Sequence, residues 1–495
     1  MNYINPLRKI NGFFAYIYIL FCSLLMSLLC TNNPFQIGYT LIDSSVFTYV
    51  AKVIVAGGMP YRDTFDHKGP LIYLIDALGL LINEQIGIWI VEVITLFIIF
   101  LYTYKIASLL RCSSLLSCFV VTVGVVVFPY YFQGGNLTEE YSCAFIIISL
   151  YYFLKIFIDY RFERCAAILC GISFASVSML RINMISLWIV MGGVIILEHI
   201  IKKRKMEFYR FVFWFSVAAA FVFIPILLWL IVNNAFYDFI RDYFIFNFRY
   251  SSDPVRASMS NIITAIKFFL MKPPLMVIFL ICFLCIKDKR NTDWLCMITL
   301  FLSVVFSCIS GQRFAHYGMS WYPLIIYMVS RVLFELSVSE ESFCQSDNKR
   351  FRRFSYYICL CLCFLLAYNT FFAEHKIDTF FTQNSSFVNH KEIASTIQSL
   401  TDEDDKISVV GNANIFYLLS NRKSASKYSY QLPIGTIHPN IWKEYYGDIA
   451  QLKAKLIILP KKNRKNYPYN EIIKIVGAKY DLVAEQYGWE IYLLK

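Results

Sequence analysis

Ionisable side chains gather in a short segment near the start of the chain, between apolar stretches. Asp43 comes first, and Arg62, Asp66, His67 and Lys68 follow it. A carboxylate can take the proton of an attacking hydroxyl, and cations can hold phosphate oxygens while charge builds on a leaving group. We therefore expect Asp43 to be a general base, with Asp66 as a second catalytic candidate. Lys68, helped by Arg62 or His67, is expected to bind a donor phosphate.

The simplest alternative for this segment is a solvated loop whose opposite charges pair with one another. Its position argues against that alternative, because the carboxylates and cations lie at the edge of a predicted bilayer. Burial of charge is costly there, and ionisable groups usually mark a pathway or a site. The residue types suit the transfer of a sugar from a phosphate leaving group to a hydroxyl.

A second polar segment, 133–141, places Glu139 and Glu140 where a helix is expected to begin. Acidic side chains at a helix N-terminus are often favourable caps, and this interpretation suits Glu140. Glu139 is the stronger functional candidate. It could orient an acceptor, assist Asp43 in catalysis, or complete a site for a divalent metal ion.

A third segment, 311–323, carries Arg313 and His316 ahead of an apolar run. Together these two side chains could contact a lipid phosphate, although a histidine at a helix start is as often a simple interface residue. Arg181, in a short turn between apolar runs, is interpreted as an interface anchor.

The composition requires lipid as a solvent for most of the chain. Of 495 residues, 58% are hydrophobic and only 16% are charged, and the mean hydropathy is +0.54. One soluble core cannot bury so much apolar surface. The formal charge of +12 does not indicate nucleic acid, because Lys and Arg stand in short clusters between apolar runs.

Apolar runs long enough to cross a bilayer predict about eleven transmembrane helices. They lie near 12–30, 86–104, 114–130, 140–158, 165–180, 182–200, 208–232, 273–286, 294–310, 317–336 and 354–373. The apolar stretch Leu71–Ile82 is short and contains Asp76. We interpret it as an interfacial or re-entrant helix, because a further span there would reverse the orientation of every later loop.

Four basic clusters fall in alternate loops and indicate which side faces the cytoplasm. They are 155–164, 202–205, 287–290 and 349–353. The N-terminus is then cytoplasmic, and the segments 31–85, 131–139, 233–272, 311–316 and everything after 374 lie outside. This topology predicts a multi-pass protein of the cell inner (plasma) membrane.

The composition becomes polar after position 374, which predicts two domains: 1–373 in the membrane, including the first outer loop 31–85, and 374–495 outside the cytoplasm. Strand-like runs at 407–410 and 456–459 and helical patterns at 412–420 and 440–452 predict a small α/β domain. A strand pair near 480–494 would close its sheet.

The polar segments resemble those of GT-C membrane glycosyltransferases. The resemblance rests on Asp43, Phe47, Ala51 and Lys52, followed by the run 65–70, Phe-Asp-His-Lys-Gly-Pro. It is closest to the protein O-mannosyltransferase-like branch (glycosyltransferase family 39 type), which includes the aminoarabinose transferase of lipid A. Leu137-Thr138-Glu139 and His316-Tyr317 with Pro323 also fall where that branch has its second acidic loop and its aromatic-proline helix start. About the first 340 residues are covered.

The resemblance implies a GT-C-like fold and an inverting hexosyl transfer from a polyprenyl-phosphate sugar, with Asp43 as the catalytic centre and Lys68 on the donor phosphate. The acceptor would be a hydroxyl on a glycan, a lipid or a protein, and membrane lipids would surround the site. The chain departs from the family at Ser44, where many members have a second acid, and at Gly69-Pro70, where some have two prolines. The resemblance therefore does not determine whether a divalent metal ion is shared, and no other cofactor is implied.

A transporter or flippase of lipid-linked glycans is the alternative function. Such a protein would also need many helices and charged outer segments. It should carry polar residues or broken helices near the middle of the bilayer, whereas the charges here concentrate in the outer loops. This distribution favours the enzyme.

Overall fold

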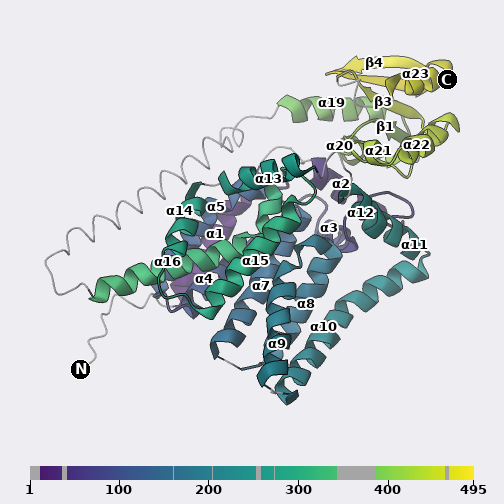
Figure 1. Ribbon diagram of the computed structural model, residues 1–495. Helices are drawn as coiled ribbons and strands as arrows, with labels where there is room; N and C mark the ends of the chain where they lie inside the picture. Colours follow the sequence, from purple (N-terminus) through teal and green to yellow (C-terminus); the bar gives the residue numbers. More distant parts are fainter. Residues whose placement is uncertain are drawn as a thin grey trace. The chain divides into compact units, whose positions relative to one another are not determined.

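The computed structural model describes residues 12–35, 42–159, 161–202, 205–251, 258–271, 274–342, 385–462 and 468–495 (Figure 1). These residues divide into two compact units. The helical unit contains the described residues of 1–33, 89–226 and 254–378. The loop–sheet unit contains those of 34–88, 227–253 and 379–495.

The helical unit is built from apolar helices joined by short connections. In chain order these elements are α1 (Gly12–Ser27), α4 (Gly87–Leu109), α5 (Ser114–Val127), α6 (Pro129–Phe132), α7 (Thr138–Asp159), α8 (Arg164–Leu180), η2 (Ile182–Met184), η3 (Trp188–Gly192), α9 (Gly193–Lys202), α10 (Lys205–Val232), α13 (Met259–Met271), α14 (Pro274–Leu284), α15 (Asn291–Cys308), η5 (Ala315–Ser320) and α16 (Tyr322–Ser342). The first residues of α4 and the last of α10 belong to the loop–sheet unit.

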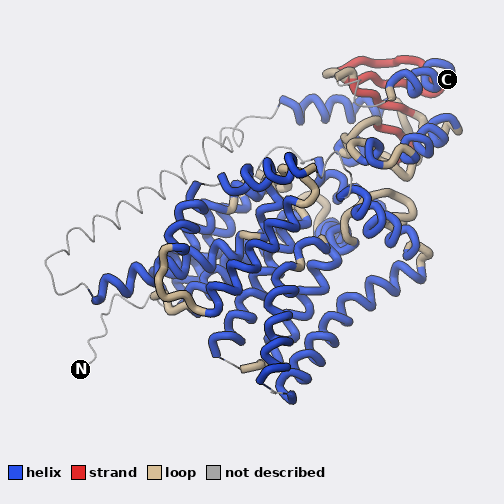
Figure 2. Tube along the Cα trace, viewed as in Figure 1, coloured by secondary structure: helices blue, strands red, loops and turns tan. Residues whose placement is uncertain are grey.

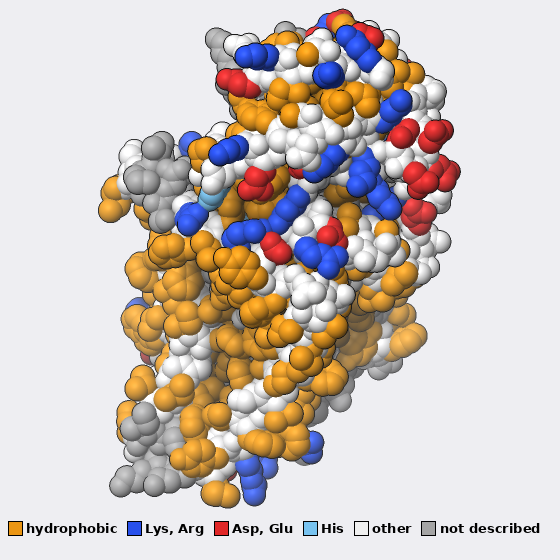
Figure 3. All heavy atoms as spheres, turned by 90° about the vertical axis from the view of Figure 1, so that its right-hand side faces the viewer, with side chains coloured by type: hydrophobic (Ala, Val, Ile, Leu, Met, Phe, Trp, Pro, Cys, Tyr) orange, Lys and Arg blue, Asp and Glu red, His pale blue; other side chains and the backbone are white. Residues whose placement is uncertain are grey.

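Five helices in the described part of the chain are long and apolar enough to cross a membrane: Gly87–Leu109, Ser114–Phe132, Thr138–Asp159, Met206–Val232 and Asn291–Cys308. Four shorter apolar helices accompany them. On α10, Phe213, Phe221 and Leu228 are exposed. Figure 3 shows hydrophobic side chains over much of the helical surface that it displays. A helix that is apolar all round requires lipid or protein on every side, so these helices form a membrane domain.

The helices predicted from apolar runs are present wherever the structure describes the chain. The run 182–200 is the least regular, since it divides into a 3₁₀ turn, a π-helix and α9. The predicted span 354–373 and the basic residues of 349–353 lie outside the described residues. Helices α2 (Ile42–Val55) and α13 were not predicted, nor were those of 236–251.

The loop–sheet unit joins two polar segments of the first half of the chain to the C-terminal region. The first segment forms α2 and α3 (Pro70–Ile82), which pack against each other. The second forms α11 (Phe236–Phe239), the π-helix η4 (Ile240–Ile245) and α12 (Phe246–Ser251). Helix α3 has 13 residues, about 20 Å at 1.5 Å per residue, which is too short to cross a hydrocarbon core of about 30 Å.

A close backbone contact fixes the end of α3. The side-chain oxygen of Asn83 accepts the N–H groups of Gln85 and Ile86, at 2.9 and 3.0 Å, and so caps the turn that follows. A Cβ on Gly87 would lie 1.8 Å from the carbonyl oxygen of Gly79. Only glycine at position 87 permits α4 to begin this close to α3.

The C-terminal region forms a five-stranded sheet in the order β2-β1-β3-β5-β4 (Figure 2). Strands β1 (Lys406–Val409), β2 (Lys423–Ser424) and β3 (Leu456–Pro460) are parallel, while β5 (Trp489–Leu494) is antiparallel to β3 and to β4 (Tyr480–Gln486). The accompanying helices are α19 (Ser385–Ser399), α20 (Ile415–Ser420), α21 (Ile434–Ile437), α22 (Asn440–Ala450) and α23 (Tyr469–Lys479). The prediction of a small α/β region with a closing strand pair is confirmed.

The core of this sheet includes a residue from the first polar segment. Tyr49 of α2 is buried with Ile407, Phe416 and Leu456. Its hydroxyl accepts the N–H of Ser424 at 2.8 Å. Segment 31–85 was predicted to belong to the membrane domain, whereas the described residues of 34–88 form one unit with those of 379–495.

Candidate functional site

Asp66 is the best-connected carboxylate of the loop–sheet unit. It is 2% exposed, and it accepts hydrogen bonds from the hydroxyls of Tyr73 and Tyr430, each at 2.6 Å. The Nδ1 atom of His67 lies 3.2 Å from Asp66 Oδ1. A buried carboxylate is stable only when charged or hydrogen-bonding groups surround it, and Asp66 has three such partners. One of them, Tyr430, comes from the C-terminal region.

The partners of Asp66 reverse the effect of burial on the pKa of its carboxyl group. Burial alone would raise the pKa of this carboxyl. The hydrogen bond and charge of His67, with the hydroxyls of Tyr430 and Tyr73, instead lower the pKa to about 2. Asp66 is therefore ionised at physiological pH, and its oxygens are already engaged.

Lys68 lies two residues after Asp66, and its backbone is held by Tyr61 and by Tyr73, one of the two tyrosines that donate to Asp66. Its carbonyl oxygen accepts the hydroxyl of Tyr61 at 2.6 Å and that of Tyr73 at 3.3 Å. Tyr61 and Tyr73 are fully buried and pack edge to face, with ring centroids 5.9 Å apart. The backbone of Lys68 is thus held in place, and its side chain is half-buried.

Asp43 lies in the first turn of α2 and is half-buried. No hydrogen bond or ion pair joins its side chain to another residue in the described ranges. Its charge nevertheless acts on Tyr430: burial, Asp66, Asp43 and Asp242 together raise the pKa of the Tyr430 hydroxyl. Asp43 therefore contributes to the electrostatic environment of Tyr430.

The other two cations of the first segment have partners of their own. Arg62 makes a two-point ion pair with Asp63, at 2.8 Å for both bonds, and donates to the carbonyl of Asn233 at 2.7 Å. The hydrogen bond from Arg62 lowers the pKa of the Asp63 carboxyl. His67 contacts Asp66 and stacks on Tyr250 with ring centroids 6.1 Å apart. Two of the three predicted phosphate-binding cations of this segment, Arg62 and His67, are thus each placed against a carboxylate.

The helical unit holds a second polar cluster around Glu139. This carboxylate is 2% exposed and forms an ion pair with Arg181. Thr138 donates to Glu139 at 2.7 Å, and His316 Nε2 lies 3.6 Å from it. The Arg181 guanidinium stands over the ring of Tyr317 at 3.9 Å. The structure thus brings together Glu139 and His316, which were both predicted as site residues.

Arg181 is the member of this cluster that the sequence analysis misread. The interpretation as an interface anchor is wrong for a side chain that is mostly buried against Glu139 and Tyr317. Its position at the end of an apolar run was the available indication, because a charge there needs a partner. Arg313, by contrast, is exposed, and no hydrogen bond or ion pair joins it to the other described residues.

A metal centre is not formed by the residues that the structure describes. Within them, no group of three or more His, Cys, Asp or Glu side chains is arranged to hold a metal ion. The carboxylate of Glu139 forms an ion pair with Arg181.

Comparison with known proteins identifies the family of this chain. Residues 9–379 match the family model described as "Putative competence-induced protein Ccs4 N-terminal domain". The chain belongs to this family. None of the curated proteins matches this Ccs4-family chain.

Solved structures resemble the Ccs4-family chain in fold over nearly its whole length. The crystal structure of ArnT from Cupriavidus metallidurans bound to undecaprenyl phosphate has a TM-score of 0.60 at 11% identity, covering 98% of both chains. The apo state of the same protein gives 0.64 at 10% identity, covering 96% of this chain and 97% of that one. The Archaeoglobus fulgidus oligosaccharyltransferase in the apo form gives 0.52 at 12% identity, covering 90% of this chain and 70% of that one.

These similarities establish a GT-C fold for the Ccs4-family chain, with many membrane helices and a small C-terminal α/β region. The predicted fold class is confirmed. At 10–12% identity the comparison establishes the fold only, and the chemistry must be argued from the residues of this chain.

The first testable prediction concerns the stability of the loop–sheet unit at low pH. Because the folded-state pKa of Asp66 is below its ordinary value, its ionised form stabilises the folded state above pH about 4, by on the order of 2 kcal/mol. This contribution is lost as pH falls toward 2, with about half remaining at pH 3. Thermal unfolding of the purified full-length protein should show a difference between wild type and Asp66→Asn that is constant from pH 7 to 5 and shrinks below pH 4.

Asp404→Asn is the matched control, because Asp404 is exposed on the same unit. Its unfolding temperature should follow that of the wild type at every pH. A wild-type advantage over Asp66→Asn that already disappears near pH 6 would contradict the low pKa of Asp66.

Proposed function

We propose that the protein transfers a sugar from a polyprenyl-phosphate donor to an acceptor hydroxyl on the outer face of the cell membrane. The observation that carries the proposal is the difference between two carboxylates, Asp66 and Asp43, in how far their oxygens are already engaged. Asp66 is buried and accepts hydrogen bonds from two tyrosines, whereas no hydrogen bond or ion pair engages Asp43 in the described ranges, and the backbone of Lys68 is held by Tyr61 and Tyr73. This difference supports Asp43 as the general base and Lys68 as the phosphate-binding cation.

The fold comparison supports the donor class. One structure with this fold contains undecaprenyl phosphate, and an Archaeoglobus fulgidus oligosaccharyltransferase with the same fold, at a TM-score of 0.52, is in complex with an inhibitory peptide and a dolichol-phosphate. We infer from these a polyprenyl-phosphate donor for this chain. The protein O-mannosyltransferase-like or aminoarabinose-transferase-like branch is the part of the superfamily that its motifs resemble.

The proposed reaction is a single displacement with inversion. The acceptor oxygen attacks the anomeric carbon while the bond from that carbon to the phosphate oxygen breaks. The hydroxyl proton passes to Asp43, and the bonding electrons leave with the polyprenyl phosphate. Lys68 offsets the negative charge that builds on the phosphate. The acceptor can be a glycan, a lipid or a protein that presents a hydroxyl.

Asp66 is assigned a positioning role in this scheme. A carboxyl with a pKa of about 2 is a weak proton acceptor, and its oxygens already receive the Tyr73 and Tyr430 hydroxyls. His67 completes this network, and Arg62 ties Asp63 to the carbonyl of Asn233. Neither cation needs to contact the donor for the mechanism to work.

The cluster around Glu139, within the helical unit, is assigned a separate role, contact with an anionic lipid head group. Glu139 holds Arg181 on the face of Tyr317, so the guanidinium is pre-oriented beside His316. Cations fixed in this way suit an anionic lipid head group. Arg313, exposed in the same segment, can add a further contact to it.

A transporter or flippase of lipid-linked glycans is the second candidate. The break of the run 182–200 into a 3₁₀ turn and a π-helix is the observation that favours it, because transporters build their sites from interrupted helices. The two functions separate in purified protein: an enzyme transfers sugar in detergent solution, where transport across a bilayer has no meaning.

Asp43→Asn tests the base. The change is nearly isosteric at a half-buried position, so the variant should fold and insert while losing the proton acceptor. Turnover should fall roughly 10²–10⁴-fold, as expected for a lost general base. The measurement is transfer of radiolabelled sugar from the lipid donor by purified protein. Asp404→Asn serves again as the control with full activity, and near-normal transfer by Asp43→Asn would move the role to Asp66 or Glu139.

Lys68→Ala tests the phosphate contact. A cation that binds the phosphate in both ground and transition states should raise the donor KM and also lower turnover when it is removed. Lys68→Arg, which keeps the charge, should recover part of both. The exposed Lys443→Ala on the same unit is the control. If KM and turnover are unchanged in Lys68→Ala, Lys68 does not belong to the site.

The proposed orientation places 374–495 outside the cell and the loop 155–164 in the cytoplasm. Glu403→Cys and Arg161→Cys each add a thiol at an exposed position, one in each region. An impermeant thiol reagent applied to intact or outer-membrane-permeabilised cells should label the first variant above the wild-type background. The second should be labelled only after lysis. The reverse pattern would invert the topology and remove the proposed site from the outer face.

A further inference from the structure

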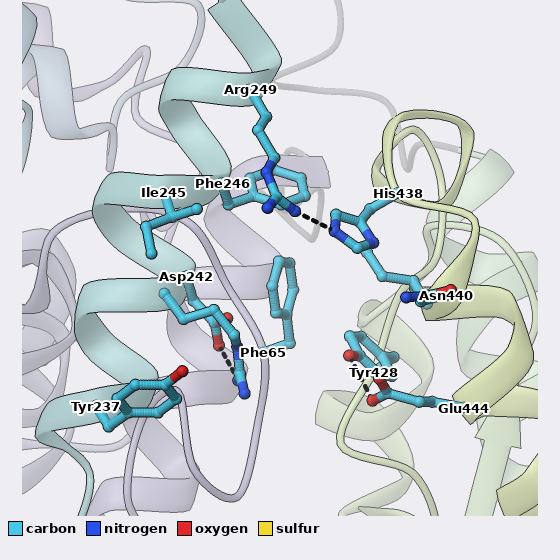
Figure 4. A pocket seen from close by; sticks show the side chains of 12 residues that line it. Phe65, Tyr237, Asp242, Ile245, Phe246, Arg249, Tyr428, His438, Asn440 and Glu444 are labelled. Atoms are coloured by element: carbon cyan, nitrogen blue, oxygen red, sulfur yellow. Dashed lines mark hydrogen bonds and ion pairs between the residues drawn. The ribbon is translucent and has the colours of Figure 1, made fainter.

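A pocket of about 350 Å³ lies wholly within the loop–sheet unit (Figure 4). The π-helix η4 and its neighbours α11 and α12 form one wall, and the C-terminal region forms the other. Phe65, from the first polar segment, lines the pocket between them. Its size is within the range of small-molecule sites.

The wall of this pocket is fixed by buried charge. Asp242 is 2% exposed and pairs with Arg241 at 2.7 Å and with Lys427 at 3.3 Å. Asp238 binds the same two cations, at 2.8 and 3.5 Å. Residues 240–245 form a π-helix, an irregularity that is frequent at functional sites. Such a network holds the pocket in shape without a ligand.

Aromatic rings and hydrogen-bonding groups alternate around the pocket. Phe65 packs between Phe246 and Tyr428, with ring centroids 5.4 and 5.3 Å apart. Glu444 accepts the hydroxyl of Tyr428 at 2.7 Å, and Asn440, which is exposed, also lines the pocket (Figure 4). The aliphatic side chains in the lining are few, Ile245 and Ile441.

The charges of the lining balance. Two guanidinium groups, on Arg241 and Arg249, face two carboxylates, on Asp242 and Glu444. His438 Nε2 lies 2.7 Å from a nitrogen of Arg249, and it is the acceptor in this contact since a guanidinium group only donates. A neutral ligand with many hydroxyl groups suits such a lining, because each hydroxyl can both donate and accept. An anion would meet the two carboxylates, and an acyl chain would leave the polar groups unpaired.

We propose that this pocket binds a neutral sugar residue of the acceptor, which makes the acceptor a glycan. The flat apolar face of a sugar ring packs on an aromatic side chain, and its hydroxyls bond to Glu444, Asn440 and the guanidinium groups. This inference rests on the proposed transfer reaction and names its acceptor class. The pocket is separate from Asp43 and Lys68, so binding and chemistry can be tested apart.

Binding to the purified full-length protein is the test. The probe is the pool of oligosaccharides released by mild acid from the envelope polysaccharide of the producing cells, labelled with a fluorophore and followed by fluorescence polarisation. Tyr237→Ala and Asn440→Ala remove groups from the rim without disturbing the core, since Tyr237 is 76% exposed and Asn440 is exposed. Each should weaken binding by about tenfold, the effect of about 1.4 kcal/mol. Glu471→Ala, at an exposed position of α23, should bind as the wild type does.

The outcomes distinguish this inference from the proposed function. Normal binding by Asp43→Asn, with transfer abolished, together with weak binding by Tyr237→Ala supports both. A second outcome is that binding depends on Tyr237 and Asn440 while Asp43→Asn retains full transfer. That outcome supports the pocket and contradicts the role of Asp43 as the base. The inference is overturned if the neutral fraction of the pool does not bind, if the two rim variants bind it normally, or if a peptide or phospholipid vesicle competes for the same residues.

Discussion

The burial of one carboxylate, Asp66, determines how the loop–sheet unit is assembled. A charged group that is 2% exposed must be surrounded by donors, and the chain supplies them from its own first segment and from the C-terminal region. Tyr73 and Tyr430, which lie 357 residues apart by number (430 − 73), meet at its two oxygens. With Tyr49 in the core of the sheet, this makes the predicted catalytic segment part of a folded unit with its own core.

This arrangement explains how a loop between membrane helices can hold the predicted catalytic groups in position. Loops are usually the mobile part of a protein, and catalysis needs reacting groups held to within a fraction of an ångström. Here Tyr61 and Tyr73 hold the backbone at Lys68. Asp66 accepts hydrogen bonds from Tyr73 in the same segment and from Tyr430 in the C-terminal region. Removing residues 379–495 would expose Asp66 and Tyr49, so point substitutions are the better way to probe the C-terminal region.

The helical unit solves the same problem of buried charge by pairing. Glu139 is neutralised by Arg181, and Arg331, which is fully buried, by Asp293 at 3.1 Å. Unpaired, each charge would cost several kcal/mol in a medium of low dielectric constant. The Arg331–Asp293 pair is explained by the stabilisation of buried charge. The pair at Glu139 also has His316 and Tyr317 as neighbours, and this set of polar groups suits a lipid phosphate.

The sequence by itself determined the membrane class, the positions of nearly all the described spans, and the strands of the C-terminal region. Hydropathy and alternation are local properties, readable wherever a segment must face lipid or a sheet core. It also selected Asp43, Lys68 and Glu139 as candidates, because charge at a bilayer edge stands out against apolar neighbours. It did not reveal α2 as a helix, Tyr430 as a partner of Asp66, Arg181 as the partner of Glu139, or the pocket beside η4. Those depend on which distant segments meet, and a buried charge or a cavity wall is defined only when the chain has folded.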